Sequence, residues 1–464
     1  MNKTTLALVL AIPVIAYPVA SWVIGGQVDA LLIKQYIQIE DNELFKRVER
    51  KIERGIFSSE EVVTFELKPE FMELLREEAE GEEPQAALEP VRFVLRSHIK
   101  HGPLPGFSSI GLGTAYTELE LNHPLVTKLY AGKSPMTSDA SVDFSGTTHA
   151  RIRSPAVENM ADGIKFSWAE LVMDVTTDRN MIDWRYQGGL PFIKVHTEDG
   201  SSHLDMQNLA FEGQQKRLFA DNPYLYTGPV KMTLQSMESQ GMSEGQPPLR
   251  LGNMLLQTSA TEKAGFMDIT AGYSIESLQL GDASYKNAHF DLALRHLEAK
   301  ALAELNQVAQ NTDSESDLSS DLSMAQFKPM LRPLQVLLEN SPEISIERMG
   351  VTTPEGDIKA SAVVKLPNAN VGDLGVAMEN PMILMGLAAV VEANAQLALP
   401  QALLMTNLSE DQAEMLPALL QSGYVLNNNG QLSTSISYAQ GKATINGQPM
   451  DPGMLVGMGE GEGE

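Results

Sequence analysis

The chain has 464 residues and no cysteine, and its 60 acidic against 34 basic side chains give a formal net charge of −26 at pH 7. This charge argues against a nucleic-acid-binding protein and against a peripheral binder of anionic lipid, since both need clustered Lys and Arg. The lack of cysteine excludes disulfides, thiol nucleophiles, iron–sulfur clusters and Cys-type zinc sites. Because 43% of the residues are hydrophobic, we expect a folded core beneath an acidic, solvated surface.

The N-terminus predicts export from the cytoplasm. Residues 6–24 are apolar apart from one Tyr and one Ser, and they follow a short head that carries Lys3. A helix of this length spans about 28 Å, close to the hydrocarbon thickness of a bilayer. Since the basic head should stay cytoplasmic, we expect residues 1–26 to be a transmembrane signal-anchor. A signal peptide cleaved near the small residues 19–21 is the alternative.

The segment after the anchor predicts one helix and then a change to strands. The apolar spacing of Val28–Lys51 fits a helical stripe and predicts a juxtamembrane helix. Val63, Phe65 and Leu67 alternate with polar residues, which is typical of a half-buried strand. Residues 70–83 are strongly acidic and predict a solvated helix or loop.

A long series of alternating runs then predicts an antiparallel sheet. The runs are separated by breaks that contain Gly, Pro or Asn, which indicates many strands joined by turns and not βαβ units. We expect strands at 91–99, 141–152, 163–177, 181–187, 191–197, 202–211, 230–236, 251–258 and 266–280. Residues 288–306 change to a helical period.

The C-terminal third predicts a mixed region. Residues 311–323 are rich in Ser and Asp and indicate a linker. Beyond it we expect a helix over Ala325–Glu339, a hairpin (344–349 and 358–366), a buried Met-rich helix at 381–391, two final strands (431–438 and 442–446) and an acidic tail. The fold class is therefore α+β and predominantly antiparallel β, an elongated β-rich body with a few packed helices, divided as 1–26, 27–310, 311–323 and 324–464.

The sequence predicts no catalytic, cofactor-binding or metal-binding residue. The strongest metal candidate combines His98, His101, Glu118, Glu120 and His123. However, His98 and His101 are three apart on a predicted strand, so their side chains should point to opposite faces. Surface and turn histidines are therefore the preferred interpretation.

Other candidate residues have equally ordinary interpretations. Two acid pairs could serve a glycoside hydrolase, which needs two carboxylates about 5–10 Å apart, but such pairs arise by chance in so acidic a chain. A Met-rich surface could bind a partner adaptably, although methionine is more often core filler. Aromatic residues that could line a groove are more often core. The residues concerned are Asp174 with Asp178, Asp199 with Asp205, the methionines Met378, Met382 and Met385, and Trp168, Trp184 and Asn208.

Three stretches carry a resemblance to a known family. They are Arg54-Gly-Ile-Phe-Ser-Ser59, His101-Gly-Pro-Leu-Pro105 and the C-terminal Ser435–Met450. Together with the apolar N-terminus and the length, they resemble the YdgA-like family of Gram-negative envelope proteins. The resemblance implies a protein held at the inner membrane with its body in the periplasm and a tendency to form homo-oligomers such as a homodimer. It implies no activity and no catalytic residues.

The sequence thus favours a non-enzymatic envelope protein that acts by self-association or by binding an envelope component. A lipid-binding or lipid-carrier protein with a curved β-sheet groove is the first alternative, because alternating strands supply one apolar face. A carboxylate-dependent hydrolase of envelope polysaccharide is the second. An open apolar groove in the folded body would favour the lipid carrier, whereas a filled core would favour a scaffold.

Overall fold

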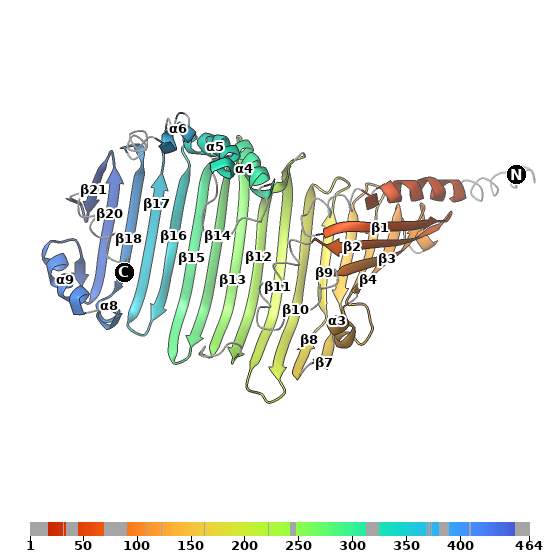
Figure 1. The fold of residues 1–464 in the computed structure, drawn as a ribbon, viewed down its shortest axis with the longest axis horizontal. Helices are drawn as coiled ribbons and strands as arrows, with labels where there is room; N and C mark the ends of the chain where they lie inside the picture. Colours follow the sequence, from red (N-terminus) through yellow and green to blue (C-terminus); the bar gives the residue numbers. More distant parts are fainter. Residues whose placement is uncertain are drawn as a thin grey trace, which may run out of the picture. The chain divides into compact units, whose positions relative to one another are not determined.

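The structure, a computed structural model, describes residues 17–450 apart from 31, 34–44, 69–90, 108, 122, 162, 221, 242–246, 312–323, 368, 370–371, 373, 380–388 and 408–409. The chain forms two compact units, Met1–Gln214 and Gln215–Glu464, and strand β11 (His203–Phe219) runs across their boundary. Every described ladder is antiparallel, so the expectation of a predominantly antiparallel β fold with few helices is confirmed (Figure 1).

The N-terminal unit is a sheet in which most strands pair with their neighbours in the chain. The spatial order is β1-β2-β3-β4-β5-β6-β9-β10, and the second half of β10 pairs with β8, which pairs with β7. A short 3-10 helix η1 (Pro105–Phe107) and a helix α3 (Pro124–Leu129) lie in its loops. The strands are β1 (Phe45–Arg54), β2 (Ser58–Leu67), β3 (Arg92–His101), β4 (Gly113–Leu121), β5 (Met136–Val142), β6 (Thr148–Ser154), β7 (Val157–Ala161), β8 (Ile164–Trp168), β9 (Leu171–Thr177) and β10 (Asp183–Thr197).

A helix over residues 17–30 packs on this sheet. Val28 and Ile24 on the helix contact Ile99 and Leu112, while Val63 and Phe65 form an adjoining buried cluster. The predicted alternation at 63–67 and at 91–99 is confirmed, because the apolar positions of β2 and β3 face this core. Residues 1–16 lie outside the described residues. Within the described part of the chain, no helix combines the length and the apolar character that crossing a membrane requires.

The predicted helix over Val28–Lys51 is wrong from residue 45 onward, where strand β1 begins. The ladder with β2 shifts register between Arg47 and Glu49, which marks a β-bulge. The extra residue lets Phe45 and Ile52, seven positions apart, share one face of the strand. A spacing of seven also places two residues on one face of a helix, so the sequence pattern favoured a helix.

The C-terminal unit contains the longest strands, which run side by side in Figure 1. Its spatial order is β12-β13-β14-β15-β16-β17-β18-β20-β21-β22, with β19 also on β20. The strands are β12 (Asn222–Gln240), β13 (Leu249–Lys263), β14 (Phe266–Leu280), β15 (Ala283–Glu298), β16 (Glu343–Thr353), β17 (Gly356–Lys365), β18 (Glu392–Pro400), β19 (Leu426–Asn428), β20 (Gln431–Ala439), β21 (Lys442–Ile445) and β22 (Gln448–Pro449). The helices are α4 (Ala299–Asn311), α5 (Met324–Glu339), α6 (Leu374–Glu379), α8 (Gln401–Asn407) and α9 (Glu410–Gln421).

The predicted elements of this unit hold with one correction. The helix at 325–339, the hairpin at 344–366 and the two final strands are confirmed as α5, β16–β17 and β20–β21. The helix predicted over 288–306 is wrong up to Glu298, because those residues continue β15 and α4 begins at Ala299. The linker at 312–323, most of the Met-rich stretch 381–391 and the acidic tail lie outside the described residues, so those predictions remain untested.

Candidate functional site

One face of the C-terminal sheet is apolar from strand to strand. Residues directly opposite each other in an antiparallel ladder share a face, so the register assembles rows of side chains across the strands. Three such rows, which we call the apolar face, follow one another along the strands. They are Gly228, Ala260, Ile269, Leu294, Ile344, Val364, Ala393, Tyr438 and Ala443; Val230, Thr258, Ala271, Leu292, Ile346, Ala362, Ala395, Ile436 and Ile445; and Met232, Leu256, Tyr273, Phe290, Met349, Ala360, Leu397 and Thr434.

The rows between them, on the opposite face, are mostly polar. One of them runs through Lys231, Gln257, Gly272, Asp291 and Arg348, and the two charged residues at its end form an ion pair of 2.8 Å. On the same face Glu343 pairs with both Arg295 (2.9 Å) and Lys365 (2.8 Å). The sheet of this unit is therefore amphipathic, with charged pairs on one side and aliphatic or aromatic side chains on the other.

The backbone keeps the apolar residues of four strands on one face where simple alternation would not. In each of β12 to β15 the alternation of apolar and polar residues is interrupted by one residue. These residues are Gln235, Asn253, Glu276 and Asn287, and the register of the ladders passes over all four. Asn253 and Asn287 adopt left-handed backbone with φ of 52°, and Asn253 donates a 2.6 Å hydrogen bond to Glu276. Left-handed residues interrupt strand alternation and bend the strand. Beyond this break the apolar pairing resumes in the row Met237, Leu251, Leu278 and Tyr285.

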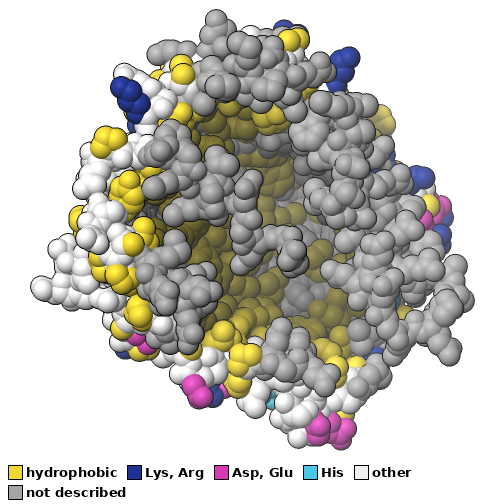
Figure 2. All heavy atoms as spheres, turned by 60° about the vertical axis from the view of Figure 1, so that its left-hand side comes forward, with side chains coloured by type: hydrophobic (Ala, Val, Ile, Leu, Met, Phe, Trp, Pro, Cys, Tyr) yellow, Lys and Arg dark blue, Asp and Glu magenta, His cyan; other side chains and the backbone are white. Residues whose placement is uncertain are grey.

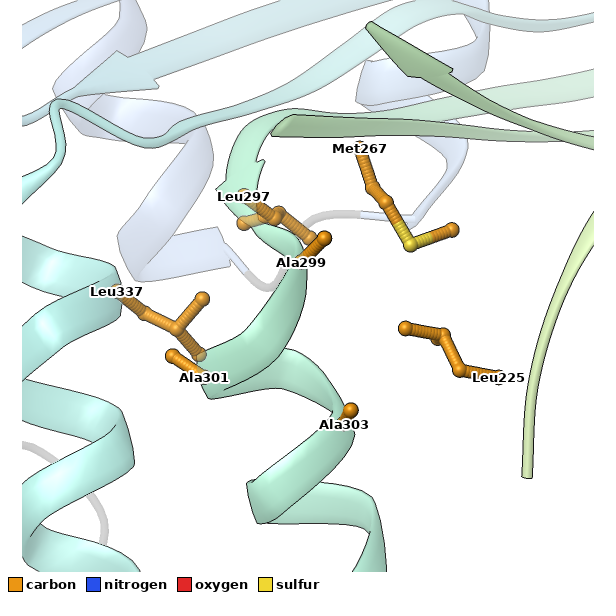
Figure 3. Close-up of a cluster of buried hydrophobic side chains, with 7 residues drawn as sticks. All are labelled: Leu225, Met267, Leu297, Ala299, Ala301, Ala303 and Leu337. Atoms are coloured by element: carbon orange, nitrogen blue, oxygen red, sulfur yellow. The ribbon is translucent and has the colours of Figure 1, made fainter. Parts of the chain in front are cut away.

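Helices cover one end of the apolar face. Ala260, Ile269 and Leu294 of the first row pack against a buried cluster that includes Met267, which is 0% exposed. The cluster draws on strands β12, β14 and β15 and on helices α4 and α5, and Figure 3 shows Leu337 of α5 beside Ala301 of α4. This end of the face is therefore a filled core.

Ile445 of the second row is buried in a cluster near the C-terminus, but six other large side chains of the apolar face remain more than one third exposed. Their exposed fractions range from 37% for Phe290 to 53% for Ile344, with Leu397, Met349, Ile436 and Val364 in between. Figure 2, which turns the C-terminal side forward, shows hydrophobic side chains lining a hollow. Each large apolar side chain left in water forgoes about 1.5–3 kcal/mol of burial free energy, so a contiguous exposed set of them indicates a binding surface.

The proposed metal candidates do not converge. His98 is exposed and pairs with Glu60, whereas His101 is 1% exposed, donates its Nδ1–H to the Ser21 carbonyl (3.0 Å) and forms a hydrogen bond between Nε2 and Ser59 Oγ (3.1 Å). The two histidines thus lie on opposite faces, as expected from their spacing. Glu120 pairs with Arg96 and Glu118 accepts a bond from Tyr116. No group of three or more metal-ligating side chains gathers among the described residues.

The acid pairs serve structural roles. Asp174 forms a two-bond ion pair with Arg151 (2.7 and 3.0 Å), which lowers the pKa of its carboxyl. Burial would raise the pKa of Asp178, but backbone N–H donors, those of Asp183 and Ile182 first, bring it below its ordinary value. A general acid needs a raised pKa, so this pair does not fit a glycosidase.

The second acid pair is likewise engaged locally. Asp199 accepts bonds from the backbone N–H of Ser201 and from the Thr197 and Ser201 hydroxyls, which lower its pKa to about 2. Asp205 lies 2.7 Å from a ring nitrogen of His196. The two acids are therefore engaged separately, Asp199 in a turn and Asp205 in a hydrogen bond with His196.

The remaining candidates separate in the same way. Trp168 packs edge-on against Tyr130 and Phe166, and Trp184 donates its indole N–H to the Met181 carbonyl. Asn208 adopts left-handed backbone within β11. Met378 lies in α6, and Met382 and Met385 lie outside the described residues. The apolar face was foreseen only as one face of alternating strands, since its rows depend on register, which the sequence does not display.

Comparison with known proteins gives one family match. Residues 1–453 match the family described as bacterial protein of unknown function, DUF945. The match includes all the strands of the apolar face. No curated protein matches the chain.

Proposed function

The chain belongs to the DUF945 family of bacterial proteins of unknown function, and we propose that it is a non-catalytic protein that binds the acyl chains of lipids on its apolar face. The observation that carries this proposal is the set of three apolar rows across the C-terminal sheet, in which six large side chains stay 37–53% exposed. Among the hypotheses that the sequence left open, such an open apolar surface favours the lipid carrier over the scaffold.

The dimensions of the apolar face suit an acyl chain. Strands in a sheet lie about 4.8 Å apart, so rows that cross from β12 to β21 extend about 38 Å. Successive rows are separated by two residues, about 7 Å, so three rows cover about 14 Å along the strands. The hydrocarbon of one bilayer leaflet is about 15 Å thick, so an extended acyl chain fits on this surface in either direction.

The chemistry of the face also suits a lipid tail. The side chains that cross it are Ala, Val, Ile, Leu, Met, Phe and Tyr with two Thr and one Gly, and no charged residue lies in the three rows. Burial of each ligand CH₂ group contributes about 0.8 kcal/mol, so affinity comes from contact area without any polar site. The absence of a fitting acid pair at Asp174 and Asp178 supports a binder over a hydrolase.

The cellular setting is part of the same proposal. We propose that the apolar residues before Tyr17 hold the chain at the inner membrane, since the helix over residues 17–30 packs on the N-terminal sheet, that the β-rich body is periplasmic, and that copies self-associate. The support is the basic head and apolar run of the N-terminus and the resemblance of residues 54–59, 101–105 and 435–450 to YdgA-like proteins.

Photo-crosslinking tests the proposal on the full chain. A fatty acid with a diazirine on its acyl chain is added to membranes that contain the protein, and cross-linked peptides are mapped by mass spectrometry. We expect cross-links at apolar-face residues such as Tyr273, Phe290 and Leu397, with few on the intervening polar rows. Cross-links spread equally over both faces, or absent from residues 222–445, would contradict the proposal.

A further inference from the structure

The N-terminal unit exposes a second apolar surface, formed by loops and not by a sheet face. Ile56 and Phe57 lie between β1 and β2, and Leu104, Phe107 and Ile110 lie between β3 and β4. Their exposed fractions run from 40% for Leu104 to 79% for Phe107. We call these five residues together with Tyr17 the loop patch.

Ring stacking and hydrogen bonds hold the loop patch together as one surface. The ring of Tyr17 stacks between Phe57 and Phe107, with centroid distances of 5.6 and 5.4 Å, and its hydroxyl donates to the Leu104 carbonyl at 2.7 Å. The backbone N–H of His101 donates to the Phe57 carbonyl at 2.9 Å, which fixes one loop against the other. The patch is therefore preorganised.

Phe107 is held in an unfavourable backbone conformation although its side chain is exposed. Phe107 has a φ of 57° and follows Gly106 at 59°, so a bulky aromatic occupies the left-handed region that normally favours Gly or Asn. This conformation is strained for a residue with a β-carbon. Since the ring is 79% exposed, the folded chain recovers little of this cost by burial. The side chain is placed for contact with something outside the unit.

The charges around the loop patch point to a lipid surface. Within residues 54–59 and 100–112 the charged side chains are Arg54 and Lys100, both basic, and the exposed Glu53 and Glu60 flank the first loop. Aromatic residues with flanking Lys or Arg are typical of the membrane–water interface. The side chain of Lys100 passes beside Gly106, the residue before Phe107.

The position of the loop patch in the chain points the same way. Tyr17, which joins both loops, directly follows the uncharged apolar run of residues 6–16. On the following helix, Val19, Trp22 and Val23 are also 49–58% exposed, and the Arg54 guanidinium lies over the Trp22 ring at 5.0 Å. We propose that the loop patch inserts into the interface of a lipid bilayer and so orients the N-terminal unit on the membrane.

A fluorescent probe tests this proposal directly, because the chain has no native cysteine and each introduced one is a unique labelling site. Full-length Phe107→Cys carrying an NBD group is reconstituted into vesicles of phosphatidylethanolamine and phosphatidylglycerol that contain a nitroxide-labelled lipid. Met160→Cys is the matched control, since Met160 is 47% exposed beside the β7–β8 turn, where β10 ends. We expect a blue-shifted emission and several-fold stronger quenching at position 107 than at position 160.

A second variant separates loss of membrane insertion from loss of folding. With the probe on Ile110→Cys, the added change Phe107→Asp should reduce lipid quenching several-fold while the circular dichroism spectrum is retained. Equal quenching at positions 107 and 160 would overturn the proposal. A blue shift of the NBD emission that appears without lipid and increases with protein concentration would show that the loop patch contacts a second copy of the chain. That result would also overturn the proposal. Neither result bears on acyl-chain binding by the C-terminal unit.

Discussion

Gly25 and His101 are packed so closely that a β-carbon on Gly25 would lie 2.7 Å from the His101 ring. The same ring hydrogen-bonds to Ser21 on the helix and to Ser59 on β2. Through one buried imidazole, the helix over residues 17–30 is therefore joined to two strands of the N-terminal sheet.

Replacement of Gly25 by Ala should destabilise the protein. Ala usually stabilises a helix interior by about 1 kcal/mol relative to Gly, but the clash with a buried ring should outweigh this, with a net loss of about 1–3 kcal/mol. Thermal unfolding followed by circular dichroism measures the change. Gly26→Ala is the matched control, because its nearest neighbour is the flexible end of Arg54 at 3.2 Å. Equal stability of the two variants would contradict the packing.

Acidification should loosen the same contact. Burial lowers the pKa of His101 below its ordinary value of about 6.5, so the unfolded state binds its proton more readily than the folded state. The contribution of the neutral imidazole is fully present above pH 6.5 and is lost as the pH falls from there through the folded pKa. Stability measured by urea unfolding should decline over that range. In His101→Asn the free energy of unfolding should depend less on pH over this range. A pH dependence equal to that of the unchanged protein would contradict the role of His101.

Loss of Arg50 should be costly because it removes the cation that pairs with a buried carboxylate. Arg50 pairs with Glu61, whose side chain is 0% exposed, at 2.7 Å, and it also contacts Asp29 of the helix. Removal of one partner of a buried pair costs about 3–5 kcal/mol. We expect Arg50→Met to destabilise the protein by about this amount in urea unfolding, and the added change Glu61→Leu to recover part of the loss.

The neighbouring Lys51 supplies the control. It pairs with Glu49 in an exposed ion pair, with side chains 71% and 53% exposed. Exposed pairs contribute about 0–1 kcal/mol. Lys51→Met should therefore leave the urea midpoint of unfolding almost unchanged. A loss of stability equal to that of Arg50→Met would show that the removal of any positive charge, and not the loss of the buried pair, is responsible.

Acyl-chain binding should depend on which face of β18 carries a charge. Leu397 lies on the apolar face, whereas its neighbour Gln396 lies on the polar face. Leu397→Asp places a carboxylate in the proposed site and removes apolar contact worth about 1.5 kcal/mol or more, so fatty-acid affinity should fall at least about tenfold. Gln396→Asp adds the same charge and should bind normally in a fluorescent fatty-acid titration. Equal affinities would remove Leu397 from the site.

The break in alternation should require a residue that accepts left-handed backbone. Asn287 has a φ of 52°, which Asn and Gly tolerate and β-branched residues do not. Asn287→Gly should preserve the melting temperature within a few degrees, while Asn287→Val should destabilise the protein by about 1–2 kcal/mol. If Val were tolerated as well as Gly, the left-handed turn of the strand would not be a determinant of the apolar face.

Sequence periodicity predicted strands where apolar residues alternate through most of the strand and failed where a bulge separates a few apolar residues. β14 and β17 lie close to their predicted ranges, whereas β16 continues past its predicted end at Met349 to Thr353. The ladders of these strands also contain register shifts, so a bulge alone does not hide a strand. In β15 the register shifts opposite Met267 and Ile269, so Leu294 and Leu297 share a face although they are three residues apart. The same effect in β1 brings Phe45 and Ile52 together. A bulge thus gives a strand the apolar spacing of a helix.

The candidate site needed information that periodicity lacks. The apolar character of each strand was visible, but alignment of Phe290 with Met349 and Tyr273 depends on the register of two separate ladders. Partial exposure depends on where α4 and α5 pack, which is a tertiary property. The sequence pattern did not predict the loop patch, because its apolar residues lie among Gly and Pro residues, which indicate turns.

The order of the strands bears on how the chain folds. From β12 to β17 each strand pairs with the one that precedes it in the chain, although a helical excursion separates β15 from β16. Each newly synthesised strand therefore finds its partner already formed, and loop closure costs little entropy at every hairpin. The sheet can grow by sequential addition, as repeat proteins do, with the growing edge always ready for the next strand. A chain stopped within this region would end on an open edge strand, whose unpaired N–H and C=O groups favour pairing with other chains.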